Sequence, residues 1–176
     1  MTSHFYEVAL FGEFFLQDLK PILNRITLHS DSSQPFHSRE FLFEPIDAQQ
    51  QRDSGTEPIL LRAKRELTDP KAPWELFSYL KPESVRVYPE ATVRPWATCQ
   101  VIGDALSFAA ALGYVYVDPK TQQPIPAHAD TLWEVEVKTT KPIKNDAETP
   151  ISRAIEAILE IQLLMKGLLD LRRQDV

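Results

Sequence analysis

The sequence predicts an α+β fold that is mostly antiparallel β-structure. Short apolar or alternating segments, separated by turns containing Pro, Gly or Asp, outnumber the segments with helical periodicity. The 176 residues fit one domain, residues 1–176. A hydrophobic content of 43% can fill one core without help from a metal or a disulfide.

Strand-like segments run along most of the chain. The clearest is 132–138, where the apolar residues Trp133, Val135 and Val137 alternate with charged residues. A strand at residues 5–11 is expected to end at Gly12, and residues 46–58 are polar and are expected to form a mobile loop. Further strands are predicted at residues 39–44, 59–66, 74–80 (a short helix also fits here), 85–88, 93–101 and 114–117.

The predicted helices flank these strands. Asp18 can cap a helix that continues to about residue 28, and Asp104 can cap residues 105–112, which end at Gly113. A long C-terminal helix is predicted from Thr149, as its N-cap, and Pro150, as its first residue, up to Arg172 and Arg173.

This C-terminal helix is predicted to carry more apolar surface than packing on one sheet requires. The helix core would use residues such as Ile151, Ile155 and Ile158. Either another part of the chain or a partner protein covers the second apolar seam. The candidate interface residues in that seam are Ile161, Leu164, Leu168 and Leu171.

Composition excludes several classes of protein. The nearest pair among the five glycines is Gly103 and Gly113, which rules out the glycine-rich nucleotide-binding loops. A single cysteine, Cys99, excludes an internal disulfide and indicates a reducing compartment. The net charge of −6 argues against broad nucleic-acid affinity. Glu7 and Glu13 interrupt the N-terminal apolar residues, so neither a signal peptide nor a membrane span is expected there.

One motif could carry chemistry. Glu134, Glu136 and Lys138 on one strand face are similar to the E-x-E-x-K signature of triphosphate tunnel metalloenzymes, which hold a divalent metal and a polyphosphate inside a barrel. Such a phosphohydrolase is the alternative function. Such an enzyme needs further strands whose charged side chains point into the barrel. For these the chain offers only four candidates: Glu40, Glu44, Arg62 and Lys64. The other interpretation is the solvent-facing half of an amphipathic strand.

Other chemistry has little support in the sequence. The four histidines lack metal-ligand spacing, and no serine lies in a G-x-S-x-G elbow. No catalytic, cofactor-binding or metal-ligating residue is therefore predicted. A freestanding nucleic-acid binder is a second alternative, since basic residues gather at residues 62–71 and 138–144, but no aromatic interleaving accompanies them.

Several short motifs follow one another in a definite order along the chain. They include Tyr-Glu-Val-Ala-Leu-Phe-Gly at 6–12, Glu-Phe-Leu-Phe-Glu-Pro at 40–45 and Leu-Arg-Ala-Lys-Arg at 61–65. Lys-Pro-Glu at 81–83, Leu-Gly-Tyr at 112–114 and the long terminal helix continue the series. In this order the motifs resemble subunit 18 of the Mediator complex in its fungal form, and the resemblance covers most of the chain except residues 46–58.

The resemblance implies an antiparallel β-barrel with flanking helices and no catalytic activity. It implies a nuclear subunit of the Mediator head module that pairs with subunit 20, is tethered by a helix of subunit 8 and helps couple regulators to RNA polymerase II. The family pattern has further long strands after Leu-Gly-Tyr, whereas residues 114–117 here run into Asp118-Pro119. The barrel is therefore expected to be open, or strands are missing after Val117.

Overall fold

The computed structural model describes residues 5–69, 71–117 and 132–174. Seven strands form one sheet in the order β6-β2-β3-β4-β5-β1-β7, and every pairing whose register is defined is antiparallel. The strands are β1 (Phe5–Phe15), β2 (Ser38–Pro45), β3 (Leu61–Glu66), β4 (Trp74–Tyr79), β5 (Thr92–Val101), β6 (Tyr114–Tyr116) and β7 (Leu132–Lys138). The helices are η1 (Leu16–Asp18), a 3-10 turn, then α1 (Leu19–Leu28), α2 (Ala48–Asp53), α3 (Ala105–Ala111) and α4 (Ile151–Met165). The prediction of an antiparallel α+β fold is confirmed, and within the described residues the sheet is not closed.

The chain divides into two compact units. Unit 1 comprises residues 1–34, 81–95 and 124–176, and unit 2 comprises residues 35–80 and 96–123. β5 contributes Thr92–Pro95 to unit 1 and Trp96–Val101 to unit 2. Each unit has its own hydrophobic core.

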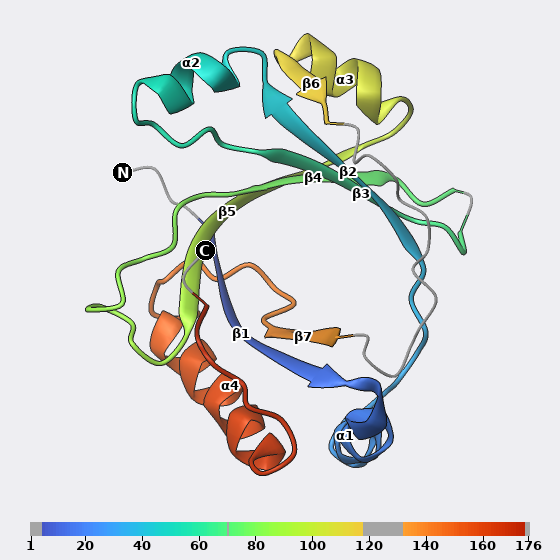
Figure 1. The fold of residues 1–176 in the computed structure, drawn as a ribbon, viewed down its shortest axis with the longest axis vertical. Coiled ribbons are helices and arrows are strands. Elements are labelled where there is room, and N and C mark those ends of the chain that lie inside the picture. Colours follow the sequence, from blue (N-terminus) through green and yellow to red (C-terminus); the bar gives the residue numbers. More distant parts are fainter. Residues whose placement is uncertain (1–4, 70, 118–131, 175–176) are drawn as a thin grey trace. The chain divides into compact units, whose positions relative to one another are not determined.

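The core of unit 1 lies between β1 and two helices (Figure 1). In β1, Val8 and Leu10 share one face and are fully buried, as expected for alternate positions of a strand. Ile22 of α1 enters this core. In α4, the 3.6-residue periodicity holds Ile151, Ile155 and Ile158 on the buried face.

The core of unit 2 lies on one face of the sheet β6-β2-β3-β4, under α3 (Figure 1). Phe43 of β2 and Leu76 of β4 are almost completely buried there. Small residues of α3, Ala105 and Ala109, allow this helix to pack close to the sheet. Asp104 caps α3, as predicted, by accepting a hydrogen bond from the backbone N–H of Leu106 at 3.0 Å.

Two predicted segments differ in the structure. Residues 85–88 were predicted as a strand but form a turn, in which the backbone N–H groups of Val87 and Tyr88 donate to the carbonyl of Ser84 at 2.9 and 3.1 Å. The hydroxyl of Ser84 also accepts from the backbone N–H of Arg86, and such local side-chain bonds compete with strand pairing. Residues 46–58, predicted as a mobile loop, contain α2.

β1 also differs from the prediction, because it continues through Gly12 to Phe15. A Cβ atom at Gly12 would lie 2.9 Å from the carbonyl oxygen of Asp170, so the glycine serves close packing and not strand termination.

The question of further strands after Val117 lies outside the described residues. No helix in the described ranges has the length and apolarity that crossing a bilayer requires.

Candidate functional site

A charged cluster joins three strands of unit 1. β1 contributes Glu7, β5 contributes Arg94, and β7 contributes Glu136 and Lys138. The register pairs Phe11 with Glu136 and Ala9 with Lys138, which puts Glu7 on the same sheet face as both β7 residues by the two-residue period of β1. These four residues are called the charged cluster below.

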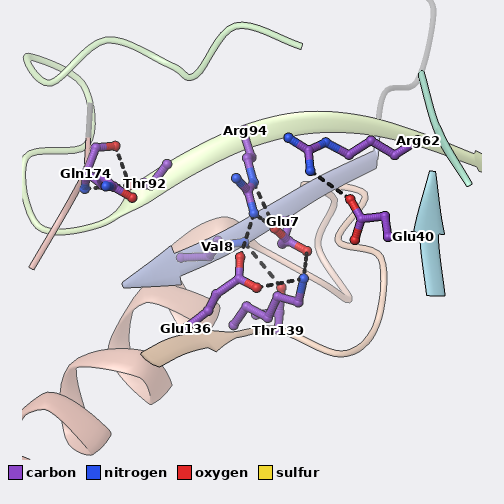
Figure 2. A network of polar contacts seen from close by, with 10 residues as sticks. Glu7, Val8, Glu40, Arg62, Thr92, Arg94, Glu136, Thr139 and Gln174 are labelled. Carbon is purple, nitrogen blue, oxygen red and sulfur yellow. Dashed lines mark hydrogen bonds and ion pairs between the residues drawn. The ribbon is translucent and has the colours of Figure 1, made fainter. Parts of the chain in front are cut away.

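Arg94 is the centre of the charged cluster (Figure 2). Its Nε and Nη2 atoms donate to Oε1 of Glu7 at 2.8 and 2.6 Å, and Nη2 also donates to Oε1 of Glu136 at 2.7 Å. Nζ of Lys138 lies 3.3 Å from Oε2 of Glu7 and 3.1 Å from Oε2 of Glu136. The two cations thus balance the two carboxylates.

The inner half of the charged cluster is shielded from water. The side chains of Glu7 and Arg94 are 4% and 11% exposed. The guanidinium carbon of Arg94 also lies 5.6 Å from the centre of the Phe11 ring, a cation–π distance. Charges removed from water are tolerated when they are paired and hydrogen-bonded, as they are here. The cluster therefore ties β1 to β5 and β7.

The three residues of the E-x-E-x-K motif do not share one environment. Glu136 and Lys138 belong to the charged cluster, whereas Glu134 is exposed and lies directly opposite Glu13 of β1. Among the described residues, no group of three or more His, Cys, Asp or Glu side chains is placed to hold a metal ion. No observation in this part of the chain favours the phosphohydrolase alternative.

The residues predicted to form further rows lie in unit 2 and form ion pairs of their own. Arg62 donates to Glu40 at 2.7 Å (Figure 2), and Arg52 donates to Glu44 at 2.7 Å. Both pairs are partly exposed to solvent, with side chains 29–46% exposed, so each contributes little to stability. Lys64 lies 4.8 Å from the centre of the Phe36 ring.

An apolar groove lies in unit 1 beside the charged cluster. It has a volume of about 330 Å³ and is lined by α1, β7, α4 and residues 169–171. Its apolar lining comprises Ile26, Val135, Val137, Ile161, Leu164, Met165, Leu169 and Leu171. Arg25, His29, Glu136 and Lys138 add charge or polarity to the lining. This cavity is called the α1–α4 groove below.

Arg25 connects the two helices of the α1–α4 groove. Its Nη1 atom donates to the carbonyl oxygen of Leu164 at 2.6 Å, in the last turn of α4. The carbonyls at a helix C-terminus lack partners within the helix, and they carry the negative end of the helix dipole. The ion–carbonyl contact therefore fixes the end of α4 against α1.

The predicted interface residues separate into two groups. Ile161 and Leu164 line the α1–α4 groove on α4 and are 39% and 37% exposed. Leu168 is half-buried, and Leu171 is 1% exposed in the core of unit 1.

The prediction that Leu168 and Leu171 lie on the C-terminal helix is wrong, because α4 ends at Met165 and not at Arg172–Arg173. Gly167 follows with a φ of +85°, a left-handed conformation that glycine adopts readily and that ends helices. The N-cap is also one residue later than predicted, at Pro150.

Sequence reasoning missed the role of the segment after Gly167. The backbone of Arg172 exchanges two hydrogen bonds of 2.9 Å with Phe11 of β1. The hydroxyl of Thr92 donates to the carbonyl of Gln174 at 2.9 Å (Figure 2), and the guanidinium of Arg173 donates to the carbonyls of Glu83, Tyr88 and Ala91. Gly167 was the available signal that this segment leaves the helix.

The fold is similar to that of a chain in the solved structure of the Schizosaccharomyces pombe Mediator head module, with a TM-score of 0.72. The two chains are 16% identical, and the match covers 97% of this chain and 100% of that chain. No family model matches the sequence, and no curated protein matches it. The chain therefore has a fold of the type found in the Mediator head.

Proposed function

We propose that this protein is a non-enzymatic subunit of the Mediator head module. The observation that carries the proposal is the fold likeness to a chain of the S. pombe head module, which extends over almost the whole of both chains. The ordered motifs that resemble subunit 18 are an independent line of support from the sequence. On this proposal the protein works in the nucleus and helps couple regulators to RNA polymerase II.

Unit 1 supplies the surface for pairing with another subunit. Among the described residues β7 is the last strand in the sheet order, and strands in that position offer backbone N–H and C=O groups to a partner strand. Leu132 and Trp133 of β7 are 48% and 37% exposed, which adds apolar surface along that edge. We assign this edge to pairing with Mediator subunit 20.

The α1–α4 groove fits the helix expected from Mediator subunit 8. An apolar helix face docks into an apolar groove through side chains spaced three or four residues apart. On the wall of the groove, Ile161 and Leu164 of α4 are themselves three residues apart and would contact such side chains. Leu171 also lines the groove, but it is only 1% exposed because it belongs to the core of unit 1. Leu168 is half-buried in the segment that follows α4.

Co-expression with subunits 20 and 8 of the same organism tests the proposal. The wild-type chain should co-purify with both subunits. Ile161→Glu combined with Leu164→Glu should weaken binding of the subunit 8 helix at least tenfold, about 1.4 kcal/mol, while the thermal melt of the isolated chain changes little. An absence of any complex with either subunit would refute the proposed function.

Two further variants act as controls. Leu163→Glu adds one negative charge to the same helix, against two in the groove variant, at a side chain that is 68% exposed and does not line the groove, so binding should be unchanged. Leu171→Glu buries a charge in the core and should unfold unit 1. Equal binding losses for Leu163→Glu and the groove variant would argue against the α1–α4 groove as the contact.

A further inference from the structure

Thr149 and Pro150 form a short motif that the proposed interface does not use. Thr149 is the only Ser or Thr in the sequence that directly precedes a proline. Its side chain is exposed at the end of the bend formed by residues 146–149, and the backbone becomes extended at Pro150, with φ −72° and ψ 142°. Protein kinases bind the segment around their acceptor residue in an extended conformation. Proline has no backbone N–H, so a proline after the acceptor is favoured by kinases whose cleft offers no hydrogen-bond acceptor at that position.

The hydroxyl of Thr149 holds the loop 144–149 in its observed shape. Its Oγ1 atom donates to Oδ1 of Asp146 at 3.0 Å and accepts from the backbone N–H of Lys144 at 3.2 Å. The same Asp146 oxygen accepts from the backbone N–H groups of Thr149 and Glu148 at 2.8 and 3.0 Å. One carboxylate oxygen and one hydroxyl therefore hold most of the loop, and the side-chain oxygen of Asn145 also accepts from the backbone N–H of Ile151 at 3.4 Å.

We propose that Thr149 is a phosphorylation site for a proline-directed protein kinase and that its phosphorylation opens the loop 144–149. In this reaction Oγ1 of Thr149 attacks the γ-phosphorus of ATP, a new O–P bond forms, and the bond to the β-phosphate oxygen breaks. ADP leaves, and the hydroxyl proton passes to the kinase base and then to solvent. This inference does not depend on the Mediator assignment.

The new charge would sit against a carboxylate that is already ionised. Hydrogen bonds from the backbone and then the hydroxyl of Thr149 hold the pKa of Asp146 below its usual value, so Asp146 is negative at neutral pH. A phosphate on Oγ1 removes the proton that bonds Asp146 and places a charge of about −2 beside it. Repulsion then separates Asp146 from the backbone of residues 148 and 149.

The opening should stay local, because the loop is anchored at both ends. Before it, Ile143 is buried and exchanges backbone hydrogen bonds of 2.8 and 3.1 Å with Tyr6. After it, Ile151 is buried in the core of unit 1 as the first residue of α4. The modification therefore changes the surface before α4 and leaves the fold intact.

Incubation of the full chain with a purified proline-directed Ser/Thr kinase and Mg-ATP tests the site. Mass spectrometry should find one phosphoryl group on Thr149, and both Thr149→Val and Pro150→Ala should prevent its addition. Phosphorylation that persists in Pro150→Ala would overturn the proline-directed assignment. If a peptide of residues 143–153 is modified while the folded chain is not, the site is inaccessible and the proposal fails.

Amide hydrogen exchange tests the opening of the loop. In the phosphorylated chain the amides of Glu148, Thr149 and Lys144 should exchange on the order of tenfold faster or more, while the amides of β1 keep their protection. Thr149→Val removes the hydroxyl but adds no charge, so it should accelerate exchange less than phosphorylation does. Unchanged exchange at Glu148 and Thr149 after full phosphorylation would contradict the opening.

Discussion

Arg94 holds the carboxylate of Glu7 with two guanidinium nitrogens, Nε at 2.8 Å and Nη2 at 2.6 Å, across 87 positions of sequence. The contact joins β5 to β1, and the chain between them contains most of unit 2. Because Glu7 is buried, its carboxylate needs partners inside the protein, and Arg94 supplies two of its hydrogen bonds.

Arg94→Met should therefore lower the free energy of unfolding strongly, by about 3–5 kcal/mol, because it leaves the Glu7 carboxylate buried with less compensation. Urea denaturation followed by circular dichroism measures the change. Adding Glu7→Gln to the Arg94→Met chain should recover part of the loss, since the buried charge is then removed as well.

A matched control for Arg94→Met lies in unit 2. Arg62 donates to Glu40 at 2.7 Å, a distance similar to those between Arg94 and Glu7, but both side chains of this pair are more than a third exposed. Arg62→Met should cost only about 0–1 kcal/mol, because water replaces the lost partner. Similar losses in both variants would show that burial does not decide the strength of the Glu7 contact.

The sequence predicted β7 and the antiparallel fold well, because the signals are local. The alternation of Trp133, Val135 and Val137 with charged residues has only one simple explanation, a strand with two unlike faces. The apolar repeat of Ile151, Ile155 and Ile158 likewise identifies about the first two turns of α4.

The charged cluster could not be predicted in the same way. The sequence placed Glu136 and Lys138 on one face, but the identity of their neighbours depends on which strands lie beside β7 and in which register. The sequence showed Glu7 only as a break among the N-terminal apolar residues, and Arg94 lay in a predicted strand without a recognisable motif. Only the strand order β5-β1-β7 brings these four side chains together.

Gly12 has a role that tertiary packing alone reveals. Its missing Cβ leaves room for the carbonyl oxygen of Asp170 and for Leu169 and Leu171, whose side-chain atoms would lie 3.1 Å from a Cβ. Gly12→Ala should destabilise unit 1 by about 1–3 kcal/mol, because the backbone of residue 170 must move. Thermal unfolding would measure the loss.

The effect of Gly12→Ala should be specific to this close approach. Glu13→Ala, at the next and exposed position of β1, is the matched control and should not lower stability comparably. Hydrogen exchange at Arg172, whose amide donates to Phe11 at 2.9 Å, should rise in Gly12→Ala. A fully stable Gly12→Ala chain with protected Arg172 would contradict the packing argument.

The cross-strand pair of Glu13 and Glu134 is electrostatically unfavourable. The two residues lie directly opposite each other in the β1–β7 register, where like charges repel. Glu134→Lys should raise the free energy of unfolding by roughly 0.2–1 kcal/mol at low salt. Chemical denaturation at two ionic strengths checks this, because salt should reduce the gain. Glu134→Gln should give a smaller gain, and a loss of stability in Glu134→Lys would contradict the pairing.

Acid should destabilise the protein partly through Asp104 and Asp146. The hydroxyl and then the backbone N–H of Ser107 lower the pKa of Asp104, and the backbone N–H and then the hydroxyl of Thr149 lower that of Asp146. A carboxyl with a lower pKa in the folded state binds fewer protons folded than unfolded. Its contribution to stability is complete above the unfolded pKa and is lost as the pH falls through the folded value.

The double variant Asp104→Asn and Asp146→Asn tests this pH dependence. Asparagine keeps an oxygen acceptor at both positions but cannot titrate, so the melting temperature of the variant should fall less steeply than that of the wild type below about pH 5. Above that pH both wild-type carboxylates are ionised, and the difference between the two chains should be constant. Melting temperatures recorded at intervals from neutral pH into the acid range measure both regions, and curves that stay parallel throughout would contradict the assigned roles of the two carboxylates.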